Sequence, residues 1–98
     1  MASARHRVTS RGPFSSILFR HPGKGGWHFA PIPLALAPPV TRGWGRTPVH
    51  AVVDGHAWDT SVWRAKGGGA VLAVPKRVRG EKKHGDTVTV TITFDEDD

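Results

Sequence analysis

Histidine, aspartate and hydroxyl side chains are the groups of this chain that could do acid–base or nucleophilic chemistry, and they meet in the segment Val49–Trp63. There Asp54-Gly55 separates two runs rich in β-branched and aromatic residues, the pattern of a β-hairpin with a two-residue turn. The resulting register places His50 opposite Asp59 on one hairpin face. Such a pair can orient a general base, with Ser61 as the nearest hydroxyl. The alternative is a plain cross-strand ion pair, and we expect no catalytic residues.

Metal binding is the second chemistry that these side chains could support. His50, His56 and Asp59 are potential ligands, but the register puts His50 and His56 on opposite hairpin faces, where they cannot share a tetrahedral site. The chain has no cysteine, which excludes disulfides and thiolate metal sites and fits a reducing compartment. We therefore expect no metal and no cofactor.

Basic and aromatic residues could instead hold an anionic or planar partner. Trp44 and Arg42, in a glycine-rich segment, could grip a base or another planar ligand, although Trp44 could equally fill one end of the fold. Five of the eight residues of Lys76–Lys83 are basic. Within them Arg79 could contact an anion, or else pair with Asp86 or cap backbone carbonyls. The candidate binding residues are Arg42, Trp44, Lys76, Arg79 and His28.

The charge of the whole chain bears on its partner. The net charge is +6, but residues 1–94 carry 14 basic against 4 acidic residues, a net charge of +10, and the other four acids are Asp95–Asp98. A body this basic suits an anionic ligand or nucleic acid. The alternative is that the charge keeps a small domain soluble and interacts with its own acidic tail.

Short strands must position these side chains. The central hairpin has a core face that reads Val49, Ala51, Val53, His56, Trp58, Thr60 and Val62. Further strands are expected at Phe14–Arg20, Trp27–Pro31, Ala70–Val74 and Thr87–Phe94. The run Ala70–Val74 is continuously apolar, which predicts burial on both faces, whereas Thr87–Phe94 alternates strictly and predicts one wet face.

Only two very short helices fit between these strands. Leu34–Ala37 could form about one turn before Pro38-Pro39 end it, as a cap over a barrel mouth, and Pro75–Glu81 could form one or two turns. The sequence thus predicts a mainly β protein, a small closed or nearly closed antiparallel or mixed β-barrel of about six strands.

The domain organisation follows from the composition of the two ends of the chain and from the range of the expected strands. Residues 1–13 are polar and are expected to be a disordered basic arm, residues 14–94 a single β-barrel domain, and residues 95–98 an acidic disordered tail. No apolar run reaches the length of a membrane span, and no signal-peptide pattern opens the chain. We expect a cytoplasmic protein without membrane contact, as a monomer or a homodimer.

Three segments resemble, in this order and spacing, the bacterial domain-of-unknown-function family nineteen-oh-five. They are Gly25–Phe29, Arg42–Ser61 and Val74–Val88, within a match over roughly Phe14–Phe94. The resemblance implies a small closed β-barrel with a short helix between the second and third strands and another before the last. Some relatives are fused to a helical domain of a bacteriocin-protection type. The pair Pro38-Pro39 departs from the longer helix usual there. The family brings no established activity, cofactor or catalytic residues.

The function favoured by the sequence is a non-enzymatic binding or interaction module. One alternative is a nucleic-acid-binding protein that uses its basic surface. Another is a small-molecule or enzyme site at a barrel mouth, lined by Trp44, His28 and Arg79.

Overall fold

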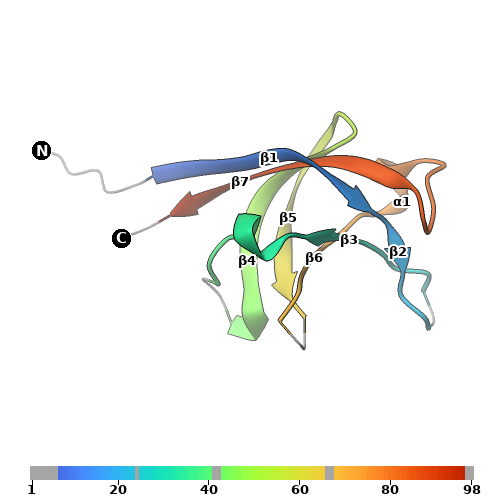
Figure 1. The fold of residues 1–98 in the computed structure, drawn as a ribbon, viewed down its shortest axis with the longest axis horizontal. Coiled ribbons are helices and arrows are strands. Elements are labelled where there is room, and N and C mark those ends of the chain that lie inside the picture. Colours follow the sequence, from blue (N-terminus) through green and yellow to red (C-terminus); the bar gives the residue numbers. More distant parts are fainter. Residues whose placement is uncertain (1–6, 24, 41–42, 66–67, 97–98) are drawn as a thin grey trace, which may run out of the picture.

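The fold is one antiparallel sheet of seven strands curled into a half-barrel (Figure 1). The computed structural model describes residues 7–23, 25–40, 43–65 and 68–96. The strands are β1 (Arg7–Ile17), β2 (Phe19–Arg20), β3 (His28–Ile32), β4 (Arg46–Val53), β5 (His56–Arg64), β6 (Ala70–Ala73) and β7 (Thr87–Glu96). Their order across the sheet is β1-β7-β4-β5-β6-β3-β2. The predicted mainly β, barrel-like architecture is confirmed, with seven strands where about six were expected.

The central hairpin β4–β5 has the predicted register. Ala51 pairs with Trp58 and Val53 with His56 across the turn. Asp54 and Gly55 have φ angles of 49° and 86°, the left-handed backbone that a two-residue hairpin turn requires. The core-facing residues of β4 are buried, whereas His56 is exposed at the turn. The turn chemistry therefore determined the faces of both strands.

Alternating apolar residues from most of the strands build the core inside the half-barrel. The apolar side chains of the alternating run Thr87–Phe94 are all buried, as a strand with one wet face requires; they are Val88, Val90, Ile92 and Phe94. The core consists of Leu18, Ala30, Ile32, Val49, Ala51, Val53, Val62, Ala70, Leu72, Val74, Val78, Val88, Val90, Ile92 and Phe94. Leu18 lies between β1 and β2, where its backbone exchanges hydrogen bonds with Gly85 and Asp86. The bent segment β1–β2 therefore supplies both edge strands of the sheet, because β1 pairs with β7 and β2 pairs with β3.

The prediction that the N-terminal arm and the acidic tail are disordered is wrong for those of their residues that the structure describes. Residues 7–13 form the first part of β1, and Asp95 and Glu96 continue β7. The two strands pair from Arg7–Glu96 to Ile17–Thr87, and Arg11 lies 5.5 Å from the centre of the Phe94 ring. Because this pairing joins the two ends of the chain, no local pattern around residues 1–13 indicates it. Residues 1–6 and 97–98 lie outside the described ranges.

The helical elements are as short as predicted. They are two 3₁₀ turns, η1 (Leu34–Leu36) and η2 (Gly43–Gly45), and a four-residue helix, α1 (Lys76–Arg79), that begins after Pro75. Leu36 and Ala37 pack against the core, and Arg64 Nη2 donates to the Pro38 carbonyl at 3.0 Å. In the described part of the chain, no helix has the length and apolar character needed to cross a membrane.

Candidate functional site

Three of the five candidate binding residues line one small pocket. His28, Lys76 and Arg79 surround a space of about 210 Å³, which we call the basic pocket; its other lining residues are Gly25, Gly26, Trp27, Val74 and Pro75. The sheet brings them together because β3 begins where β6 ends: the amide of Val74 donates to the His28 carbonyl at 2.9 Å. The helix α1 follows directly and places Lys76 and Arg79 beside the start of β3.

Of the other two candidates, the structure describes only the backbone of Trp44. Arg42 lies outside the described residues. The backbone of Trp44 belongs to η2, which leads into β4 at Arg46, opposite Trp63 near the end of β5. That end of the sheet is the start of β6, whereas α1 follows the end of β6 (Figure 1). The sequence could not reveal this separation, because it depends on how three strands are aligned.

The positive charges of the basic pocket are not neutralised by any described carboxylate. Lys76 Nζ donates to the Gly80 carbonyl at 2.9 Å, and Arg79 Nη1 donates to the Lys82 carbonyl at 3.1 Å. Arg79 Nε is buried without a hydrogen-bond partner. Among the described residues, neither cation pairs with a carboxylate, and the alternative pairing of Arg79 with Asp86 is not formed. Backbone carbonyls satisfy donors but do not neutralise a full charge.

The histidine of this pocket is held in place by the glycine-rich turn before β3. Only 8% of His28 is exposed, and its Nδ1–H donates to the Gly26 carbonyl at 2.8 Å. Its ring therefore faces the inside of the half-barrel with a fixed orientation. Trp27, the residue before it, points to the outer face, because successive side chains of an extended chain point to opposite faces.

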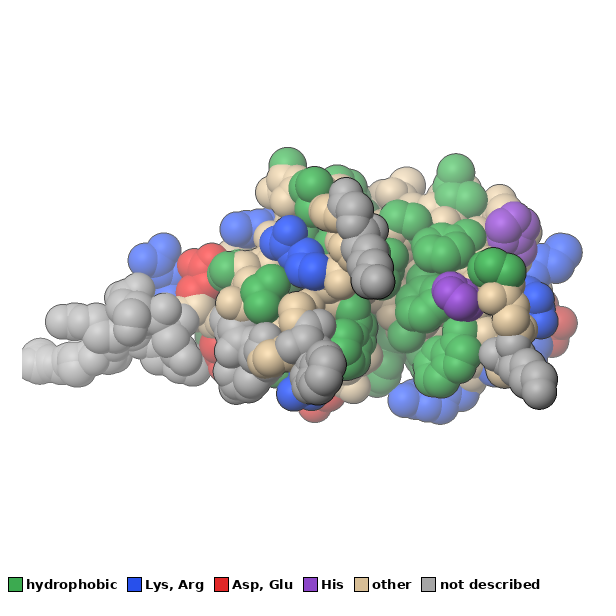
Figure 2. Space-filling model, turned by 90° about the horizontal axis from the view of Figure 1, so that it is seen from below, with side chains coloured by type: hydrophobic (Ala, Val, Ile, Leu, Met, Phe, Trp, Pro, Cys, Tyr) green, Lys and Arg blue, Asp and Glu red, His purple; other side chains and the backbone are tan. Residues whose placement is uncertain are grey.

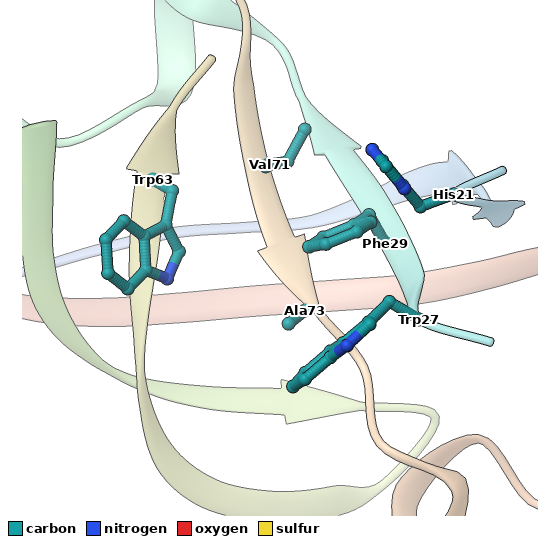
Figure 3. A pocket seen from close by; sticks show the side chains of 6 residues that line it. All are labelled: His21, Trp27, Phe29, Trp63, Val71 and Ala73. Atoms are coloured by element: carbon teal, nitrogen blue, oxygen red, sulfur yellow. The ribbon is translucent and has the colours of Figure 1, made fainter. Parts of the chain in front are cut away.

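A second, larger site lies on the outer face of the sheet and was not predicted from the sequence. It is an apolar depression of about 500 Å³, here called the aromatic groove, lined by His21, Trp27, Phe29, Trp63, Val71 and Ala73. Figure 3 shows the two tryptophans on either side of β6, with the small side chains of that strand between them. On the molecular surface, hydrophobic side chains gather over the half of the molecule that holds β3 and β6, bordered by Lys and Arg (Figure 2).

Strand register explains the groove. Phe29 of β3 pairs with Ala73, and Trp63 of β5 pairs with Val71, so small residues of β6 lie between large rings of its two neighbours. The expectation that Ala70–Val74 is buried on both faces is therefore wrong, since Val71 and Ala73 are only half-buried and line the groove. The signal in the sequence was that side-chain alternation places Trp27 and Phe29 on one side of their strand and Trp63 on the hairpin face opposite the core. The proximity of these rings depends on the strand order.

Several aromatic rings in and beside the groove contact one another. Trp27 stacks on Phe29 with ring centres 6.4 Å apart and an interplanar angle of 19°, and Phe19 and His21 contact the same Phe29 ring. Arg46 lies 5.9 Å from the centre of the Trp63 ring. Nevertheless 60% of Trp27 and 39% of Trp63 remain exposed. The groove thus offers preorganised aromatic surface to solvent.

The predicted His50–Asp59 pair forms, with Nδ1 and Oδ1 2.9 Å apart. Its side chains are 52% and 90% exposed, on a shallow depression that also contains Thr60 and Thr93. Such an exposed pair matches the cross-strand ion pair considered above better than an oriented general base, which is held in a site that limits water. No cluster of three potential metal ligands occurs within the described ranges.

Comparison with known proteins confirms the family that the sequence resembles. Among curated proteins, no match to the chain was found. A family model described as a domain of unknown function, DUF1905, matches residues 14–92, which takes in the hairpin, the groove and the basic pocket. The chain therefore belongs to the DUF1905 family.

Proposed function

We propose that the protein is a non-enzymatic binding module whose aromatic groove holds a planar group of its ligand. The observation that carries this proposal is the exposure of Trp27 and Trp63 on either side of an apolar floor. Large apolar side chains that are exposed together mark binding sites, and a volume near 500 Å³ lies within the range of about 300–1,000 Å³ typical of ligand pockets.

The shape and charge of the surroundings favour one class of occupant. Two indole rings border an apolar depression with small side chains between them, and a flat ring placed there can stack on an exposed indole. The adjoining residues are basic, and Trp27 lines both the groove and the basic pocket. A planar ligand that carries negative charge therefore complements this face better than an aliphatic or cationic one.

Calorimetry with small aromatic compounds tests the proposal. Phenol, indole and phenyl phosphate are suitable probes. Trp63→Ala should weaken the binding of those that bind at least tenfold, because it removes one of the two exposed indoles that border the groove. Leu34→Ala is the control, since Leu34 is 55% exposed but lies outside the groove. Equal affinities for the parent and Trp63→Ala, or no binding of any probe, would contradict the proposal.

Single-stranded nucleic acid is a second candidate partner. The combination that favours it is an exposed stacking surface next to a basic pocket, on a body with a net charge of +10 over residues 1–94. Proteins that bind single strands use aromatic platforms together with positive grooves.

A further inference from the structure

We propose that the basic pocket is an anion subsite, which takes the phosphate or carboxylate group of the ligand whose planar part occupies the aromatic groove. This inference rests on the proposed function for the planar part only. The anion subsite itself depends on the charges and hydrogen bonds around His28, Lys76 and Arg79.

The first step is the difference between these cations and others of the same segment. Lys82 Nζ lies 2.7 Å from the Asp54 carboxylate, and Lys83 Nζ lies 3.9 Å from that of Asp86. Among the residues that the structure describes, the side chains of Lys76 and Arg79 instead donate to backbone carbonyls and to no carboxylate. Lys76 and Arg79 thus carry charges that no described carboxylate neutralises, and both line a pocket, whereas Arg77 of the same helix is exposed outside it.

The second step is the composition of the pocket. Its described lining contains two cations and a histidine, and no carboxylate. Arg79 commits one nitrogen to the Lys82 carbonyl, which fixes the guanidinium while its buried Nε has no partner. Fixed guanidinium groups bind phosphate and carboxylate through charge-assisted hydrogen bonds.

The third step is continuity with the groove. Trp27 lines both spaces, and the next residue, His28, lies within the basic pocket. An indole at this boundary can contact the ring of a ligand whose anionic group extends past it toward Lys76. A ring with a directly attached phosphate or carboxylate is the smallest ligand that would use both sites.

The experiment compares phenyl phosphate, benzoate, phenol and inorganic phosphate by calorimetry and by amide chemical shifts of the full chain. Phenyl phosphate or benzoate should bind at least tenfold more tightly than phenol. If phenyl phosphate binds better, the anionic group of the natural ligand is a phosphate, and if benzoate binds better, it is a carboxylate. Lys76→Gln should reduce the affinity for the anionic probe about tenfold and leave phenol unchanged, as expected for one charged hydrogen bond. Arg79→Lys provides a second variant that keeps the charge but loses the planar fork, and it should also weaken phenyl phosphate.

Arg77→Gln is the matched control, because Arg77 is an exposed residue of the same helix that does not line the pocket. It should change the affinity less than twofold. Equal losses of affinity in Arg77→Gln and Lys76→Gln would contradict the anion subsite and indicate an effect of general surface charge.

If phenol binds and phenyl phosphate binds no more tightly, the anion subsite is contradicted while the proposal for the aromatic groove remains. Shifts at His28 and Arg79 with inorganic phosphate alone would support the subsite even if phenol failed to bind.

Discussion

At the scale of single residues, Asp54 connects the turn of the central hairpin to two other elements. Its backbone amide donates to the Thr89 carbonyl, its Oδ1 accepts from the Thr89 amide, and Lys82 Nζ lies 2.7 Å from Oδ2. Burial alone would raise the pKa of this carboxyl. The hydrogen bonds from Lys82 and Thr89, with the charges of Lys82 and His56, outweigh burial and lower the pKa below 3.8.

Asp54→Asn should therefore lower the free energy of unfolding at pH 7 by up to about 1 kcal/mol, the value of a partly exposed ion pair. Asparagine tolerates the left-handed backbone at this position. A carboxyl whose pKa is depressed by folding stabilises the protein above its unfolded pKa, and this contribution is lost as pH falls through the folded pKa. Urea unfolding from pH 7 to pH 3 should show the parent and variant converging below about pH 4.

Lys82→Gln is the companion variant, because it removes the same ion pair from the other side. It should show a similar loss at pH 7, and the double variant should lose little more than either single one. Fully additive losses would mean that the Asp54–Lys82 pair does not stabilise the fold.

At the scale of elements, a bulge lets β1 follow β7 along its whole length. The register shifts between Arg11 and Phe14, and Gly12 at this point has φ +116°. A Cβ atom there would lie 2.6 Å from the Val90 carbonyl oxygen, which belongs to the backbone of β7. Only glycine allows the two strands to approach this closely.

Gly12→Ala should accordingly lower the free energy of unfolding by roughly 1–3 kcal/mol, from backbone strain and displacement of β7. Gly69→Ala is the control, since a Cβ there meets no atom within 4 Å and its φ is not in the left-handed region; its effect should stay within about 0.5 kcal/mol. Urea denaturation of both variants measures the difference. An unchanged Gly12→Ala stability would show that the bulge does not constrain β1.

At the scale of the whole molecule, charge is distributed unevenly between the two ends. The start of β1 and the end of β7 lie at one end, where Arg7 and Glu96 approach to 3.8 Å, and α1 lies toward the other end (Figure 1). The sequence left open whether the acidic tail balances the basic body. Glu96 does contact a basic residue, but that residue is Arg7 rather than one of α1.

If single-stranded nucleic acid is the partner, this distribution predicts a salt-dependent interaction centred on α1. Fluorescence anisotropy with a labelled single-stranded oligonucleotide should give a linear fall of log Kobs with log salt, with a slope of about −0.7 for each phosphate contacted. Lys76→Gln should reduce the slope by roughly that amount, whereas Trp63→Ala should lower affinity at every salt concentration. The absence of any anisotropy change at low salt would exclude this partner.

Local sequence patterns determined the elements of the central and C-terminal parts of this protein. The Asp54-Gly55 turn determined the hairpin register and its core face, and the alternation of Thr87–Phe94 determined the inward side of β7. Pro33 and Pro75 directly precede η1 and α1, and Pro38 follows η1 after one residue. The opposition of His50 and Asp59 followed from the same register. These features depend on residues close together in the chain, whose turn geometry and side-chain periodicity are intrinsic.

Tertiary structure alone decided the features that depend on strands distant in sequence. The pairing of β1 with β7 gave structure to residues 7–13, and the placement of β6 between β3 and β5 created the aromatic groove. The meeting of β3 with the segment before α1 brought His28 to Lys76 and Arg79 and left Trp44 in a different part of the fold. Strand order is chosen by burial of the whole core, a collective free energy that no short segment of sequence contains.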